Sequence, residues 1–179
     1  LQTNNIDDES TLLAIEDGQS RVQAMALIHQ NLYQNQDIGS ISFEEYANQL
    51  VKQLASVYES ENKVEVELKG KNTFFDIDTA IPVGLILNEL VSNAFKHAYK
   101  DVTEPKLHVA LTKAEDLLLI VKDNGPGFEE KGGDIATFSF GMELVQSLSK
   151  QLKATLSYEF EEGTVVRMTI PESTFTKAN

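Results

Sequence analysis

The spacing of hydrophobic positions along this chain changes several times, and each change indicates a different structural element. Over residues 6–36, apolar side chains recur every three or four positions, which predicts helix. Gly18 lies in the middle of that stretch, so one interrupted helix and two shorter helices are both possible. The polar string over residues 34–40 ends the helical pattern and marks a boundary.

A second helical stripe begins at Ser42, which forms a capping box with the acid three residues later, and runs through Tyr58. Residues 64–68 then alternate between apolar and charged side chains, as in a strand with one solvated face. Residues 74–77 are the expected partner of this strand, since residues 70–72 have the composition of a turn.

Farther along the chain, the pattern predicts two more helices and two hairpins. Asp78 or Thr79 is expected to cap a long helix that has Pro82 in its first turn. The other expected elements are a hairpin of residues 107–111 and 117–122, a helix over residues 141–150 with Leu144, Val145 and Leu148 buried, and a hairpin of residues 154–160 and 164–170.

Hairpins outnumber β–α–β units in this pattern, so the sheet should be mixed and mostly antiparallel, with helices on one face. The expected fold class is therefore α+β: a two-layer α/β sandwich preceded by a helical segment. We divide the chain into that segment (residues 1–38), the main domain (residues 39–172) and a C-terminal tail (residues 173–179).

Composition narrows the classes of function. The chain has 179 residues and a formal net charge of −13, which argues against a nucleic-acid backbone or an anionic membrane as the main partner. It contains no cysteine, which excludes disulfides and thiolate metal sites and is consistent with a reducing compartment. No apolar run approaches the length of a membrane span, and no signal peptide is visible. Because the sequence begins with Leu rather than Met, we expect it to be a piece of a longer protein.

The most informative polar residues lie within nine positions of one another. Glu89, Asn93, Lys96 and His97 stand at helical spacing and so share one face, opposite a face of apolar residues. An acid, an amide, a lysine and a histidine together can position water, bind a divalent cation and neutralise phosphate. Taken alone, Lys96 could instead be a solvated lysine, and Glu89 with Asn93 an ordinary surface pair.

Two glycine-containing segments add to this polar face. Asp123-Asn-Gly125-Pro-Gly127 follows an apolar strand, so its backbone can approach a flat ligand and its carboxylate can accept from an amine such as that of adenine. The same residues also suit an ordinary turn. Gly141 opens a helix, where backbone N–H groups can hold phosphate. No Gly-x-x-x-x-Gly-Lys-Ser/Thr motif occurs, so the site is not of the Walker type.

In combination and order, these segments resemble the ATP-binding fold shared by gyrase, heat-shock chaperones, sensor histidine kinases and mismatch-repair ATPases. The resemblance covers residues 43–171 and implies ATP and Mg²⁺ as cofactors. It makes Asn93 the Mg²⁺ ligand, with Lys96 facing phosphate and His97 at the edge of the nucleotide. Glu89 stands where the ATPase branches have a carboxylate that polarises the nucleophile.

The resemblance also implies how the rest of the nucleotide is held. Asp123 corresponds to the residue that reads adenine, and residues 129–140 correspond to a mobile lid. The chain departs from the family pattern at Ser139, where another glycine is common. The remaining nucleotide contacts that the resemblance implies are Gly125, Gly127, Phe128, Gly141, Met142 and Thr164.

Residues 20–33 indicate the branch of the family. They resemble the second dimerisation helix of histidine kinases whose acceptor box reads His-Arg-Val-Lys-Asn-Asn. That box is absent here, so the resemblance makes residues 1–38 a truncated dimerisation and phosphotransfer segment and places the phosphoacceptor before Leu1. His29 is then expected to be a structural histidine, and His108 a strand residue without chemistry.

The resemblance as a whole implies the catalytic domain of a two-component sensor histidine kinase. Such an enzyme transfers the γ-phosphoryl group of Mg-ATP to a histidine and then to an aspartate of a response-regulator receiver domain. We expect a homodimer for the full-length protein, and a cytoplasmic location without contact with nucleic acid or membrane, whether or not the parent protein is membrane-anchored. Two alternatives remain open: an anti-sigma type protein-serine kinase on the same fold, and a non-catalytic docking module.

Overall fold

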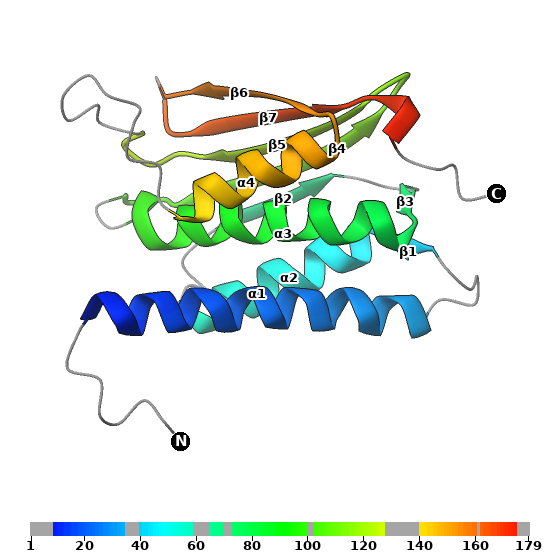
Figure 1. The fold of residues 1–179 in the computed structure, drawn as a ribbon. Coiled ribbons are helices and arrows are strands. Elements are labelled where there is room, and N and C mark those ends of the chain that lie inside the picture. The colour runs from blue at the N-terminus through cyan, green and yellow to red at the C-terminus, as the bar shows by residue number, and fades with distance from the viewer. Residues whose placement is uncertain are drawn as a thin grey trace.

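The computed structural model describes residues 9–34, 40–58, 65–69, 73–99, 102–127, 140–160 and 162–174, and a five-stranded sheet forms one of its two layers (Figure 1). The strands follow the order β2-β4-β5-β7-β6. Their bounds are β2 Glu65–Lys69, β4 Lys106–Lys113, β5 Leu117–Asp123, β6 Thr155–Glu159 and β7 Val165–Ile170. Among these strands β2 pairs in parallel with β4, and the other pairs are antiparallel. The prediction of an α+β fold with a mixed, mostly antiparallel sheet is confirmed.

The helices form the second layer, on one face of the sheet (Figure 1). They are α1 (Glu9–Gln34), α2 (Phe43–Val57), α3 (Ile77–Asn93) with its π-helical continuation η2 (Ala94–Ala98), and α4 (Phe140–Gln151). A short 3-10 turn, η3, follows the last strand at Glu172–Thr174. Helices α2, α3 and α4 contact strands of the five-stranded sheet, whereas α1 packs on α3 and α2 and contacts the short strand β1 (Ile41–Ser42). The core lies between α3 and the sheet, where Ile86, Leu87, Leu107, Leu119 and Met168 are almost completely buried.

Helix α1 is continuous, so the interruption considered at Gly18 does not occur. A Cβ atom at Gly18 would meet nothing within 4 Å, and the residue sits in an unbroken 26-residue helix. Ala24 and Ile28 are buried, yet Val22 remains 67% exposed and Met25 remains 41% exposed. Helix α1 is thus apolar on more than one side.

The start of α2 follows the capping prediction, since the Ser42 hydroxyl accepts a hydrogen bond from the Glu45 backbone N–H at 3.4 Å. The prediction for residues 74–77 is wrong. Phe74–Phe75 forms β3, which pairs with β1 (Ile41–Ser42) and not with the preceding strand. Phe75 is buried edge-to-face against Phe43, and this contact holds β3 near the start of α2. Strand β2 pairs instead with β4, in the register Glu65 opposite Lys106.

Helix α3 begins earlier than expected. Its N-cap is Asp76, whose carboxylate accepts from the Thr79 N–H at 2.8 Å, so neither Asp78 nor Thr79 is the cap. Pro82 therefore lies in the second turn and not in the first. The helix is buried over almost its whole length, including Asn88 and Glu89, because α1, α4 and the sheet surround it.

Both predicted hairpins are present, with Lys113 opposite Leu117 in the first and β6 paired with β7 in the second. The predicted burial of α4 is only partly right. Its inner side consists of Gly141, Val145 and Ser149, which are buried, while Leu144 and Leu148 lie on the flanks and are half-buried. The spacing of four residues puts these three side chains on one side of α4. Gly141 faces Glu89 of α3, and the Ser149 hydroxyl lies 3.6 Å from the sulfur of Met168 in β7.

Candidate functional site

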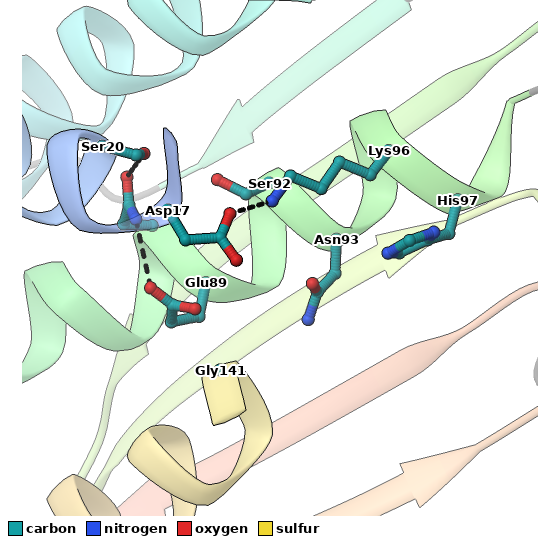
Figure 2. A pocket seen from close by; sticks show the side chains of 9 residues that line it. Asp17, Ser20, Glu89, Ser92, Asn93, Lys96, His97 and Gly141 are labelled. Carbon is teal, nitrogen blue, oxygen red and sulfur yellow. Dashed lines mark hydrogen bonds and ion pairs between the residues drawn. The ribbon is translucent and has the colours of Figure 1, made fainter. Parts of the chain in front are cut away.

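The polar residues of α3 and η2 face a small pocket between three helices (Figure 2). The pocket has a volume of about 70 Å³, room for a few water molecules. Helix α3 places Glu89 and Asn93 on its wall, and the wider π-helical turn of η2 brings Lys96 and His97 to the same side. The other residues that line it are Asp17 and Ser20 of α1, Asn88 and Ser92 of α3, and Gly141 of α4.

Glu89 forms a bidentate ion pair with Arg21 of α1. Its Oε1 accepts from Arg21 Nε at 2.8 Å and its Oε2 accepts from Arg21 Nη2 at 3.0 Å, while the Asn88 amide donates to Oε1 at 3.3 Å. The two charged side chains are only 15% and 8% exposed. The pKa of the Arg21 guanidinium is raised, mainly by this hydrogen bonding to Glu89. The arginine also lies 4.9 Å from the centre of the Phe140 ring at the start of α4.

Lys96, expected to face phosphate, forms an ion pair with Asp17 of α1. Its ammonium also lies 5.9 Å from the centre of the Tyr58 ring. Burial lowers the pKa of Lys96, but the hydrogen bond and charge of Asp17 together with Tyr58 outweigh burial and raise it. Lys96 is therefore charged at neutral pH, and its charge is balanced within the protein.

His97 lies one residue farther along, on an exposed part of η2. Partial burial of its ring, followed by the positive charge of Lys96, lowers the pKa of His97 below 6.5, although Asp17 partly opposes this. The imidazole is therefore neutral at physiological pH.

Gly141 and Met142, near the start of α4, lie close to Glu89 and Asn93 of α3. The Asn93 amide nitrogen lies 3.6 Å from the Met142 sulfur. A Cβ atom at Gly141 would come within 2.4 Å of Glu89 Oε2, which Arg21 already holds in place. A larger residue at this position would therefore press on the Glu89 carboxylate. Within the described part of the chain, the buried Ser92 hydroxyl at this pocket has no hydrogen-bond partner.

A second cluster surrounds Asp123 at the end of β5. Asp123 is 6% exposed, and its Oδ1 accepts from the backbone N–H of Gly125 at 2.9 Å and of Thr164 at 3.1 Å. Gly127 and Gly163 both have positive φ, and a Cβ atom at Gly163 would lie 2.1 Å from the Asp123 carbonyl oxygen. These glycines are thus needed for contacts within the protein itself.

The two clusters adjoin each other at Ala98. A Cβ atom at Gly125 would lie 2.6 Å from both the Cβ and the carbonyl oxygen of Ala98, the last residue of η2. The structure therefore brings the predicted residues Asp123, Gly125, Gly127 and Thr164 next to the end of the polar face. Phe128, Ser139 and the predicted lid, except Phe140, lie outside the described residues.

The other two histidines lie away from the pocket. His29 is exposed on α1, and its structural role stays a prediction. His108 lies in β4, where its Nδ1 is 2.8 Å from Glu67 Oε2 on the neighbouring β2, in agreement with a strand-pairing role.

Sequence reasoning missed Asp17 and Arg21. In the sequence, both look like ordinary charged residues of a helix surface. The one hint of a shared role is their spacing of four residues, which puts them on the same side of α1.

Comparison with known proteins identifies the fold around these two clusters. The family model described as "Histidine kinase-, DNA gyrase B-, and HSP90-like ATPase" matches residues 78–174, and the one described as "Histidine kinase" matches residues 1–58. The first match covers more than half of the chain. The chain belongs to the histidine kinase-, DNA gyrase B- and HSP90-like ATPase family.

Individual relatives point to the histidine kinases within this family. The chain is 26% identical over 164 residues to blue-light-activated histidine kinase 2 of Erythrobacter litoralis, covering 86% of this chain and 46% of that protein. It is 25% identical over 175 residues to sensor histidine kinase PdtaS of Mycobacterium tuberculosis, covering 95% of this chain and 34% of that protein. The chain thus spans less than half the length of these relatives.

The fold of this ATPase-family chain is also found in a solved structure, the histidine kinase domain of a blue-light-activated histidine kinase from Erythrobacter litoralis. The TM-score is 0.76 at 23% identity, over 88% of this chain and 75% of that one. In the described residues, no helix is long and apolar enough to cross a membrane. They also contain no cluster of three or more His, Asp or Glu side chains that could hold a metal on its own.

Proposed function

We propose that this chain is the catalytic part of a two-component sensor histidine kinase, which transfers the γ-phosphoryl group of Mg-ATP to a histidine and then to a response-regulator aspartate. The observation that carries the proposal is the contact between Gly125 and Ala98, which joins the Asp123 cluster to the polar face of α3. An adenine reader and phosphate-facing groups then lie on adjacent parts of one surface. Family membership supports ATP as the ligand.

The residues present fit this ligand. Asn93 offers a neutral amide oxygen, which suits a Mg²⁺ ion that takes most of its ligands from phosphates and water. Lys96 would neutralise phosphate, and the N-terminus of α4 at Gly141 would offer backbone N–H groups to it. Glu89 would polarise the nucleophile, and Asp123 would accept from the adenine amine with an orientation fixed by two backbone N–H groups. We assign the remaining nucleotide contacts to His97, Gly125, Gly127, Phe128, Met142 and Thr164.

Mg-ATP supplies the transferable phosphoryl group, and the chain contributes mainly positioning and charge neutralisation. We further propose that residues 1–38 belong to the dimerisation and phosphotransfer segment of the His-Arg-Val-Lys-Asn-Asn branch. On this view the acceptor histidine precedes Leu1, the full-length protein is a homodimer, and His29 is not phosphorylated. A response-regulator receiver domain is the expected partner.

Calorimetric titration with ATP in the presence and absence of Mg²⁺ tests binding. We expect Mg²⁺-dependent binding by the wild-type chain, and at least tenfold weaker binding by the Asp123→Asn and Asn93→Ala variants. Asn48→Ala is a matched control, since the Asn48 amide donates to the Glu44 carbonyl within α2 and lies outside the pocket. Absence of nucleotide binding by the folded wild-type chain would instead favour a docking module.

Incubation with ATP labelled at the γ-phosphate, with and without an added acceptor helix, tests transfer. We expect little labelling of the chain alone and labelling of the added helix on histidine. Strong labelling at His29 would overturn the assignment of the acceptor. Phosphoserine in place of phosphohistidine would favour the anti-sigma type of kinase.

A further inference from the structure

Helix α1 contributes two charged side chains, one turn apart, to the polar face of α3. Asp17 pairs with Lys96, and Arg21 pairs with Glu89. Both α3 partners are residues to which the proposed function gives a role with phosphate or nucleophile. A third contact lies between them, where the Ser20 hydroxyl donates to the Asn88 side-chain oxygen at 3.0 Å.

The Glu89 carboxylate accepts three hydrogen bonds while it is paired with Arg21. Each of its oxygens accepts from a different guanidinium nitrogen, and one also accepts from Asn88. The Glu89 side chain is 8% exposed, so little water can reach the carboxylate. The pair with Arg21 therefore occupies acceptor positions of Glu89 that would otherwise be open to a nucleophile.

The pair with Asp17 changes the charge of the pocket. The Asp17 carboxylate lines the pocket together with Asn93 and Lys96, and Figure 2 shows it pointing at the lysine ammonium. It neutralises the lysine and adds a negative charge at the place where phosphate would bind. In a half-buried pocket such repulsion is screened much less than in bulk water.

Arg21 also connects α1 to the beginning of α4. Its guanidinium lies between the Glu89 carboxylate and the Phe140 ring, and Phe140 precedes the buried Gly141. The docked position of α1 is thus joined to both helices that border the pocket. A displacement of α1 would release the Glu89 carboxylate, the Lys96 ammonium and the start of α4 together.

We propose that Asp17 and Arg21 form a two-point latch that holds α1 over the nucleotide pocket, so that α1 docking and phosphate binding compete for Lys96 and Glu89. This inference rests on the proposed function, because it requires that the pocket binds Mg-ATP. If the two compete, nucleotide binding moves α1 away from the pocket. Conversely, a movement of the dimerisation segment that contains α1 changes the affinity for ATP.

Calorimetry with Mg-ATP tests the latch on the full chain. Asp17→Asn removes the negative charge and frees Lys96, so we expect it to bind Mg-ATP about tenfold more tightly than wild type. The matched control is Glu16→Gln, which removes an exposed acid from the neighbouring position of α1, outside the pocket, and should leave the affinity unchanged. Circular dichroism establishes that each variant is folded.

Hydrogen exchange of the wild-type chain gives a second readout without any substitution. Mg-ATP should reduce the protection of α1 amides while increasing protection near Asp123. Equal or weaker binding by Asp17→Asn, together with α1 protection that nucleotide does not change, would overturn the latch and leave the proposed function intact. If neither the folded wild-type chain nor the folded Asp17→Asn variant binds ATP, both the proposed function and the latch are overturned.

Discussion

Replacing Arg21 with Met should destabilise the protein strongly, although the new side chain is apolar and of similar length. The substitution leaves the Glu89 carboxylate buried and unpaired, with 8% of its side chain exposed. Removing one partner of a buried ion pair costs about 3–5 kcal/mol, and the partial exposure of Arg21 favours the lower end of that range. Loss of the contact with the 70% exposed Phe140 ring adds about 0.5 kcal/mol.

Replacing both partners of the ion pair should give a very different result. Arg21→Met with Glu89→Met removes both charges, so no ion is left without a partner and the double variant should be close to wild type in stability. The coupling energy of this double-mutant cycle should therefore exceed about 2 kcal/mol, well above the usual error of additivity.

Urea denaturation followed by circular dichroism measures these free energies, and thermal denaturation gives a second readout. A loss of about 3 kcal/mol should lower the melting temperature by roughly 6–12 °C in a chain of this size. Lys106→Met is the matched control, because Lys106 and Glu65 form an ion pair whose side chains are 54% and 72% exposed. It should leave the midpoint nearly unchanged. If Arg21→Met were as mild as this control, the pair would not be formed in solution and the reasoning would fail.

Three further predictions concern single residues. Gly141→Ala should cost about 1–3 kcal/mol in stability, since its methyl group would press on a carboxylate that Arg21 holds; unchanged urea denaturation would show that α4 starts elsewhere. Gly163→Ala should cost about 2 kcal/mol or more, because φ is +92° and the methyl group would meet the Asp123 carbonyl; a melting temperature equal to wild type would contradict this contact. The pKa of His97 is lowered below 6.5 in the folded state, so protonation of this histidine favours unfolding. The contribution of neutral His97 to the free energy of unfolding is therefore present above pH 6.5 and is lost as the pH falls through the folded-state pKa. His97→Gln should therefore lose less melting temperature than wild type on acidification from about pH 7.5 to 5, whereas parallel profiles would rule out this linkage.

Local patterns along the sequence were enough to predict most of the elements. The N-cap at Ser42 and the two hairpins follow from spacing and turn composition, and the structure has all three. Glu89 and Asn93 also follow from α-helical spacing, whereas Lys96 and His97 reach the same pocket from the π-helical turn η2, which the spacing did not predict.

The errors arose where partners far apart in sequence decide the outcome. The turn composition of residues 70–72 suggested a hairpin, yet burial of Phe75 against Phe43 places β3 beside β1 and leaves β2 to pair with β4. The early cap at Asp76 was missed because Asp78 and Thr79 are equally good capping residues by type. Only tertiary contacts distinguish such alternatives.

The ion pairs between α1 and α3 could not be predicted for a similar reason. Arg21 and Glu89 are 68 positions apart in the sequence, and each is a residue type that is common on helix surfaces. Helix α1 is apolar on more than one side, so its pattern does not reveal which side faces α3. The α3 side of the pocket can thus be predicted from the sequence, whereas the α1 side becomes known only from the packing of the helices.

The hydrogen bond from the Thr164 backbone to the Asp123 carboxylate has a consequence for biosynthesis. It joins positions 41 residues apart, and Gly163 packs directly on the Asp123 carbonyl. A growing chain that has emerged only a short way past Asp123 has the Gly125 N–H but still lacks the Thr164 N–H, the second of the two groups that orient this acid. The adenine side of the proposed site is therefore completed last, when the C-terminal hairpin pairs with β5. Premature termination before Gly163 would thus yield a polypeptide that retains every residue of the polar face but lacks the Gly163 and Thr164 contacts with Asp123.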